Sequence, residues 1–230
     1  MATSGTHTFT LDIADTLEEA YERVDSELRS GYDYRTARRS LDMLLLEWQN
    51  RGLNLWTVKN ASETLVAGTQ AYALSNEKLD IIEGLLRTKA GNTSTQSDLS
   101  MRRVSVSTFA KQTNKLQTGR PIQYWISRAP EAITVNVWPV PDSAATYTFN
   151  YYYMERIEDT GKPASNTVDV PARYLPALTA GLAYYIGLKT PSATQKLPIL
   201  QAEYERQWEL AADSSREKAS WMLVPKMSRV

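Results

Sequence analysis

Alternation of apolar and polar residues within Gly119–Asp159 is the feature that most constrains the fold. In Ile133–Trp138 and Tyr147–Met154, β-branched or aromatic side chains occupy every second position. This period of two is typical of half-buried β-strands. A third apolar run, Ile122–Ser127, precedes them, and prolines between the runs favour turns. We therefore expect these three runs to form an antiparallel meander with a β core.

The preceding segment predicts further short strands. Leu55–Val58, Glu63–Val66 and Ala71–Leu74 are rich in strand-forming residues, and Ala67-Gly68-Thr69 favours a turn between the last two. Leu79–Arg87 is apolar enough for a strand or a short helix. We prefer a strand because it contains adjacent isoleucines and because its glycine would destabilise a helix by about 1 kcal/mol.

Two segments before the meander lack a strand pattern. Ala90–Ser100 is polar and poor in apolar residues, which predicts a loop. The pattern leaves open whether this loop contacts a partner. Ser105–Lys115 favours a short helical turn around Phe109 and Ala110.

The N-terminal quarter predicts a helical hairpin. Asp15 or Thr16 can cap a first helix that ends near Leu28, where Ser30-Gly31 would stop it. A second helix begins at Asp33 and ends near Arg51-Gly52, with the glycine as a C-terminal cap. Each helix has an apolar stripe at helical spacing, so we expect the two to form a helical hairpin.

The C-terminal third predicts two more helices. The first runs from Ala172 to about Lys189, and its small residues allow a close neighbour. Thr190-Pro191 ends it. The second begins near Thr194 or Pro198 and continues to about Lys218.

These elements predict an α+β protein. A helical bundle of residues 1–54 and 170–218 accompanies an antiparallel β-sheet or sandwich domain of residues 55–169. Residues 219–230 form an extended C-terminal tail with five apolar residues, Trp221, Met222, Leu223, Val224 and Met227. An apolar terminus of this kind either folds back on its own core or inserts into another subunit.

Composition excludes several kinds of chemistry. The chain has no cysteine, so thiol catalysis, disulfides and cysteine metal sites are excluded. Its single histidine, His7, lies near the N-terminus without an obvious partner for acid–base work. The 26 basic and 26 acidic residues balance, which gives no overall attraction to nucleic acid or anionic membrane. No apolar run approaches a membrane span or a signal peptide, so we expect a soluble protein made in the cytoplasm.

No catalytic or cofactor motif is present. The sequence lacks the glycine-rich phosphate loops, the GxSxG nucleophile elbow, HExxH and the EF-hand pattern. The neighbouring carboxylates Glu18/Glu19 and Glu158/Asp159 do not indicate two groups facing across a cleft. We therefore expect neither an enzyme nor a bound metal or cofactor.

Basic residues gather on the second predicted helix. Arg35, Arg38 and Arg39 lie on its polar face, where they would touch nucleic acid or an acidic partner, or simply form a solvated surface balanced by Asp42 and Glu47.

Five segments resemble the head-to-tail adaptor proteins of tailed bacteriophages, also called connectors, head completion proteins or tail tubular protein A. In chain order they are YRTARRSLDMLLLEWQNRGLNLWTV (34–58), TGRPIQYWISR (118–128), ITVNVWPVPD (133–142), YTFNYYYMERIED (147–159) and VDVPARYLPALTAGLAYYIGLK (168–189). The resemblance extends over roughly the whole chain.

The resemblance implies a virion protein at the head–tail junction. Members of this family form a ring, commonly of twelve copies, beneath the portal protein. The ring continues the channel for double-stranded DNA and does not read the DNA sequence. It also docks the tail or nozzle protein. In this family the C-terminal segment reaches the portal, which implies portal binding by the five apolar tail residues. Exposed aromatic residues are expected at the subunit or tail interface, namely Trp56, Tyr124, Trp125, Trp138 and Tyr152. Basic residues expected at the channel or an interface are Arg35, Arg38, Arg39, Arg102 and Arg103.

Two other classes of function remain open on the sequence. One is a tail-associated peptidoglycan hydrolase, for which a zymogram is the direct test. The other is a binding module that works alone, which a stable monomer without affinity for portal would indicate.

Overall fold

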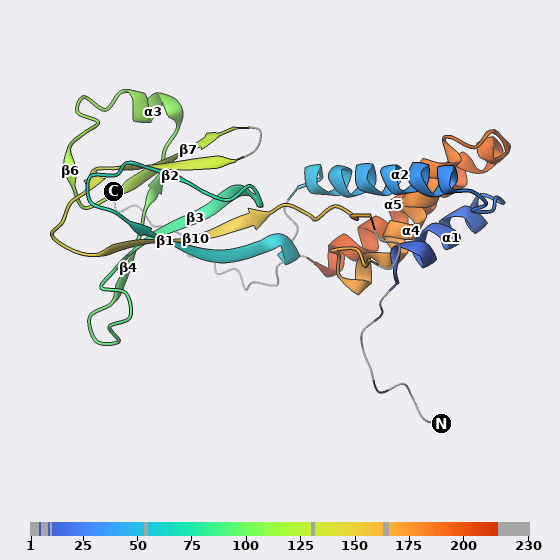
Figure 1. Cartoon of the computed structure of the whole chain (residues 1–230), viewed down its shortest axis with the longest axis horizontal. Helices are drawn as coiled ribbons and strands as arrows, with labels where there is room; N and C mark the ends of the chain where they lie inside the picture. Colours follow the sequence, from blue (N-terminus) through green and yellow to red (C-terminus); the bar gives the residue numbers. More distant parts are fainter. Residues whose placement is uncertain are drawn as a thin grey trace, which may run out of the picture. The chain divides into compact units, whose positions relative to one another are not determined.

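The computed structural model describes residues 5, 9, 11–52, 55–129, 132–162 and 166–215. The chain divides into two compact units (Figure 1), a helical unit of Met1–Leu55 with Glu158–Val230 and a β unit of Trp56–Ile157. The helical unit contains residues from both ends of the sequence, and the β unit lies between them in the chain. The predicted α+β class is confirmed.

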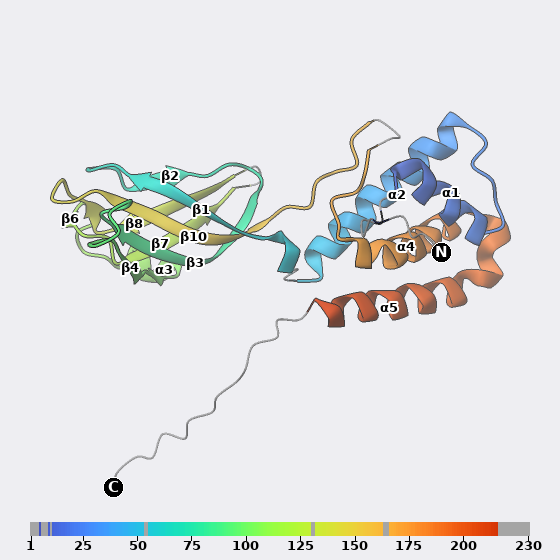
Figure 2. The same cartoon turned by 90° about the horizontal axis from the view of Figure 1, so that it is seen from below.

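Four α-helices build the described part of the helical unit: α1 (Ile13–Arg23), α2 (Gly31–Asn50), α4 (Leu175–Gly187) and α5 (Leu197–Ser214). Short 3₁₀ turns precede the last two, η2 (Ala172–Tyr174) and η3 (Pro191–Lys196). Helix α4 packs against α1, α2 and α5, and Figure 2 shows α2 and α5 on either side of it. Most residues of α4 are buried, as expected of a central helix.

Both N-terminal helices begin earlier than predicted, because the capping residues differ. Asp12 caps α1 by accepting a hydrogen bond from the Asp15 backbone N–H at 2.8 Å. Ser30 caps α2 and forms a capping box with Asp33, so Ser30-Gly31 starts a helix instead of stopping one. Helix α1 ends at Arg23 and not near Leu28, since Asp25 adopts a left-handed backbone with φ of 54°.

The C-terminal helices follow the prediction more closely. The predicted break at Thr190-Pro191 is confirmed, because α4 ends at Gly187 and η3 starts at Pro191. The predicted close approach of a neighbour is confirmed at Gly181, where a Cβ atom would lie 2.8 Å from the Tyr204 ring. The structure describes α5 to Ser214, and the predicted end near Lys218 lies outside the described residues.

A hydrogen-bonded cluster ties α2, α4 and α5 together. The Glu47 carboxylate of α2 accepts hydrogen bonds from Tyr185 Oη of α4 at 2.7 Å and from Tyr204 Oη of α5 at 3.1 Å. Trp48 Nε1, fully buried, donates to Tyr204 Oη at 2.8 Å. Arg51 Nε donates to Glu47 at 2.8 Å, and its guanidinium covers the Tyr204 ring. One carboxylate thus fixes the positions of three helices.

The electrostatics of this cluster favour the ionised carboxylate. Burial disfavours ionisation of Glu47, but the hydrogen bonds from Tyr185 and Arg51 outweigh it and lower the pKa of Glu47 below its ordinary 4.5. Burial, together with the hydrogen bond to Glu47, raises the pKa of Tyr185 to about 12. Both shifts keep the tyrosine a donor and the carboxylate an acceptor around neutral pH.

Within its described residues, 56–129 and 132–157, the β unit has ten strands: β1 (Val58–Leu65), β2 (Ala71–Ala73), β3 (Lys78–Thr88), β4 (Ser97–Ser100), β5 (Arg102–Arg103), β6 (Thr118–Gly119), β7 (Gln123–Arg128), β8 (Ile133–Trp138), β9 (Val140–Pro141) and β10 (Tyr147–Glu155). One sheet has the order β1-β10-β3-β4 and a second the order β2-β8-β7-β5; β6 and β9 form a small parallel pair. Inward side chains of the two larger sheets share one apolar core, so the unit is a β-sandwich.

The predicted three-strand meander is wrong at its third strand. Strands β7 and β8 are antiparallel neighbours, as predicted. Strand β10, however, lies in the other sheet between β1 and β3. Both edges of β8 are already paired, with β7 and β2, and β10 finds partners of its own length in β1 and β3.

Boundaries in the earlier strands also differ from the prediction. Leu55–Thr57 is a 3₁₀ turn (η1), and one strand, β1, replaces the two predicted between 55 and 66. The predicted loop Ala90–Ser100 ends in strand β4, which pairs with β3. An ion pair between Arg87 and Asp98 at 2.7 Å supports this pairing, which a polar sequence does not reveal.

Several local predictions are confirmed. Leu79–Arg87 is a strand, within β3. The turn at Ala67-Gly68 and the helical turn around Phe109 are present, the latter as α3 (Val106–Ala110).

Close packing at Gly84 of β3 is a constraint within the sandwich. A Cβ atom there would lie 2.5 Å from Phe149 Cε2 and 3.0 Å from the Tyr124 ring. Phe149 itself stacks on Tyr151 and meets Tyr124 edge-on, so its ring has little room to move. Gly84, which favoured a strand over a helix in the sequence analysis, therefore also leaves room for two aromatic rings.

We predict that Gly84→Val lowers the free energy of unfolding of the β unit by about 1–3 kcal/mol, because the added atoms overpack an aromatic core. Urea unfolding followed by near-ultraviolet circular dichroism measures this. Ser62→Ala, at an exposed position of β1, is the control and should stay within about 0.5 kcal/mol of wild type. Equal stability of Gly84→Val and wild type would show that the rings adjust freely.

We predict that Glu47→Ala destabilises the helical unit by about 1–3 kcal/mol at pH 7, because it removes the acceptor shared by two tyrosines and an arginine. Since the folded-state pKa of Glu47 is lowered, its contribution is complete above the ordinary carboxyl pKa and is lost as pH falls through the lowered value. The difference from wild type should therefore shrink in acid. Glu18→Ala, on the exposed side of α1, is the control. A difference independent of pH between 7 and 3 would contradict the assignment.

Candidate functional site

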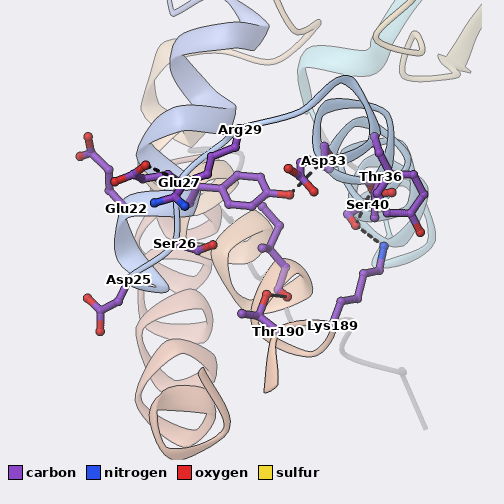
Figure 3. A pocket seen from close by; sticks show the side chains of 14 residues that line it. Glu22, Asp25, Ser26, Glu27, Arg29, Asp33, Thr36, Ser40, Lys189 and Thr190 are labelled. Carbon is purple, nitrogen blue, oxygen red and sulfur yellow. Dashed lines mark hydrogen bonds and ion pairs between the residues drawn. The ribbon is translucent and has the colours of Figure 1, made fainter. Parts of the chain in front are cut away.

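A hollow of about 890 Å³ opens in the helical unit beside the loop that joins α1 to α2 (Figure 3). The end of α4 closes its other side. Polar and charged side chains dominate its lining, among them Tyr21, Glu27, Arg29, Asp33, Ser40 and Lys189. Because both signs of charge are present, the hollow offers no uniform field for an anion or a cation.

Several charged groups of this hollow are engaged with their neighbours. Glu27 pairs with Arg29 at 2.8 Å, and Asp33 belongs to the capping box of α2. Lys189 Nζ donates to Ser40 Oγ at 2.6 Å (Figure 3). Burial and the nearby charge of Arg39 lower the pKa of Lys189.

A serine beside a lysine can act as a nucleophile and its base, but the geometry here does not fit that role. The Ser40 side chain is only 2% exposed. Its hydroxyl donates to the Thr36 carbonyl at 3.2 Å and accepts from Lys189, so its proton points away from the amine. The pair therefore links α2 to the turn that follows α4 and does not indicate hydrolysis.

The described residues hold no group of three or more His, Asp or Glu side chains placed to bind a metal ion. In the same part of the chain, no helix combines the length and apolar character required to cross a membrane. The remaining candidate sites are therefore surfaces, beginning with those predicted from the sequence.

The predicted interface aromatics differ in exposure. Tyr124 is a core side chain of the sandwich, 1% exposed, and does not lie on the surface. Tyr124 lies on the inward face of β7. The sequence did not show which face is inward, because apolar residues occupy neighbouring positions of this strand. Tyr152 of β10 lies on the outward face and is 44% exposed.

The three predicted tryptophans are half-buried. Trp125 of β7 packs against Phe109 of α3, with ring centroids 5.5 Å apart. Trp138 Nε1, at the end of β8, donates to the Asn114 carbonyl at 2.9 Å. Trp56 lies in the turn that precedes β1.

The predicted basic residues fall into two groups. Arg38 donates to the Gly161 carbonyl at 2.8 Å, and Arg103 donates to the Ile81 carbonyl at 2.7 Å while pairing with Asp80. Arg38 and Arg103 therefore stabilise the fold by bonding to backbone carbonyls distant in sequence. Arg35, Arg39 and Arg102 are exposed and form no ion pair with a residue that the structure describes. Arg35 and Arg39 lie on α2. A role at the channel or an interface stays a prediction for these two residues and for Arg102.

The five tail residues predicted to bind the portal, Trp221, Met222, Leu223, Val224 and Met227, lie outside the described residues.

The sequence analysis missed a group of exposed apolar residues on the helices. Tyr32, Met43 and Leu46 of α2 and Ile199 and Leu210 of α5 are all more than half exposed. Their signal in the sequence is an apolar side chain at helical spacing on the face opposite the buried stripe.

Comparison with known proteins gives one family. The model of the SU10 adaptor protein family matches residues 8–228. No curated protein matches the chain. The predicted resemblance to phage head-to-tail adaptors is confirmed by this match, which includes both units. The chain belongs to the SU10 adaptor protein family, a family of head-to-tail adaptors of bacteriophages.

Proposed function

We propose that the protein is a structural subunit of the virion that joins the head of a tailed phage to its tail. The observation that carries this proposal is the family match over residues 8–228, which spans the helical unit and the β unit together. The geometry of the helical unit supports it. Side chains that line the hollow bond to neighbouring segments of the chain, which is a structural role. Apolar side chains on α2 and α5 are exposed, as is common at protein–protein interfaces.

In this proposal, copies of the protein form a closed ring beneath the portal protein. The ring has twelve subunits, as is common among the phage adaptors that the sequence resembles. A ring of identical subunits needs two different, complementary faces on each copy. Exposed apolar side chains on two separate helices, α2 and α5, supply such faces.

The ring would continue the DNA channel of the portal. Balanced charge over the whole chain supports passage without retention, because each phosphate contact releases counterions and strengthens binding. Double-stranded DNA would pass without sequence being read, since base readout needs side chains placed in a groove.

The tail and the exposed aromatics are assigned to partners. We place Trp221–Met227 against the portal, because an apolar segment beyond the last helix gains from burial in a partner. Tyr152 and the half-buried Trp56, Trp125 and Trp138 are assigned to the subunit or tail interface, where aromatic side chains are common anchors. Tyr124 is left out of this set because it is buried in the core.

The function itself is tested by removing the gene for this protein from its phage. We expect filled heads without attached tails, seen by electron microscopy, because the joining subunit is missing. A plasmid copy of the wild-type gene is the control and should restore tailed particles. Tailed, infectious particles formed without the protein would contradict the proposal.

Deletion of residues 219–230 is predicted to leave a folded protein that no longer binds portal rings, because the apolar anchor is lost. Pull-down on purified portal measures binding, and circular dichroism confirms folding. The double variant Lys226→Ala/Arg229→Ala keeps the five apolar residues and should bind like wild type. If the deleted protein binds portal as well as wild type, the tail is not the anchor.

A further inference from the structure

Helix α2 carries an exposed stripe on the side opposite its buried one. Tyr32, Arg35, Arg39, Met43 and Leu46 recur at steps of three and four residues, so they lie on one face of the helix. The exposed fractions of Tyr32, Met43 and Leu46 are 66%, 61% and 52%. We call these five residues the α2 face.

Within the part of the chain that the structure describes, no acidic side chain pairs with the two arginines of the α2 face. Arg35 and Arg39 donate only to the Gly31 carbonyl and the Thr36 hydroxyl in the contacts described, and neither forms an ion pair there. The acidic residues of the same helix are engaged elsewhere: Asp33 in the capping box, Asp42 with Thr160, and Glu47 in the central cluster.

Helix α5 carries an exposed stripe of the opposite charge. Ile199, Ala202, Glu205, Glu209 and Leu210 are exposed, with Ile199 at 70% and Leu210 at 58%. We call them the α5 face. The single basic residue of this helix, Arg206, is paired with Glu203 at 2.7 Å. Glu209 forms no ion pair with a described residue.

The two faces point away from one another. Helices α2 and α5 pack on either side of α4 (Figure 2). The buried residues of each helix form one stripe, which lies in the interior of the helical unit. Their exposed stripes must then face outward in different directions, so one copy cannot satisfy both. Two unlike, complementary faces that point in different directions generate a head-to-tail assembly.

We propose that the α2 face of one copy docks on the α5 face of the next copy, with Arg35 and Arg39 opposite Glu205 and Glu209. The apolar residues Met43, Leu46, Ile199 and Leu210 would be buried at this contact. At a rise of 1.5 Å per residue, Tyr32–Leu46 spans about 21 Å and Ile199–Leu210 about 16 Å, so the stripes are of similar length.

A second copy fits better than another occupant, because each face supplies the charge and the apolar surface that the other lacks. This inference rests on the proposed ring and adds which surfaces close it. A portal or tail protein as the occupant of either face is the alternative, and the experiments below distinguish the cases.

Thiol cross-linking tests the pairing directly, since the natural chain has no cysteine. The variant Met43→Cys/Leu210→Cys is treated with a short bis-maleimide, both as purified, concentrated protein and bound to portal rings. A head-to-tail contact joins the two faces of successive copies and should give a ladder of dimers, trimers and larger species. Met43→Cys alone and Leu210→Cys alone lack the complementary thiol and should remain monomers.

The ladder has a matched control and a clear contrary outcome. Leu116→Cys, at a 78% exposed position of the β unit, replaces Leu210→Cys in the control double variant and should give no ladder. Absence of the ladder in both preparations overturns the proposal. Dimers from Met43→Cys alone indicate a symmetric contact and also overturn it, and cross-links of either cysteine to portal identify portal as the occupant and overturn it.

Charge reversal provides an independent test. Arg35→Glu/Arg39→Glu places acidic residues opposite an acidic face and should weaken assembly on portal by more than about tenfold, as should Glu205→Lys/Glu209→Lys. The chain with all four changes restores opposite charges and should recover assembly. Lack of recovery in a folded quadruple variant contradicts the pairing.

The failure of this inference differs from failure of the proposed function. If wild-type protein binds portal and restores tailed phage while neither charge reversal affects either property, the function stands and the faces are wrong. If the gene proves dispensable for tail joining, the function fails whatever the cross-links show.

Discussion

The Glu47 carboxylate joins three of the helices of the helical unit. It accepts from Tyr185 on α4 and Tyr204 on α5, while Trp48 beside it donates to the same Tyr204 hydroxyl. These bonds fix how the three helices rotate about their axes, because each partner has one direction of approach. Once the rotation is fixed, so is the side of α2 and α5 that faces solvent. The exposed faces with which we propose subunits join are thus a consequence of this hydrogen-bonded cluster.

Strand β10 has a comparable place in the β unit. Tyr147, Phe149, Tyr151 and Tyr153 point from it into the core, where Phe149 stacks on Tyr151. Its backbone pairs with β1 along one edge and β3 along the other. The rings need room on the facing sheet and on β3, and Gly84 supplies it by having no side chain. Burial of the aromatic side chains of β10 therefore restricts which residue β3 can have at position 84.

Local patterns predicted most elements of the fold, since each depends on residues close in sequence. The strand β8 was predicted with its observed bounds, and β3 and α3 were predicted in type and place. The failures involve long-range pairing. β10 was assigned to the wrong sheet, and β4 was missed because its pairing with β3 depends on backbone bonds and the Arg87–Asp98 ion pair. Tyr124 was placed on the surface because alternation shows two faces without showing which one is inward.

The sequence by itself determined the α+β class, the positions of most helices and strands, the absence of cysteine chemistry and the resemblance to phage adaptors. These follow from composition, periodicity and short motifs, which are properties of neighbouring residues. Tertiary structure alone decided which strands share a sheet and which arginines are engaged in structure. It also decided which apolar residues of α2 and α5 remain exposed. The physical reason is that burial is a property of the packed whole: a side chain at helical spacing is core or surface according to what the rest of the chain brings against it.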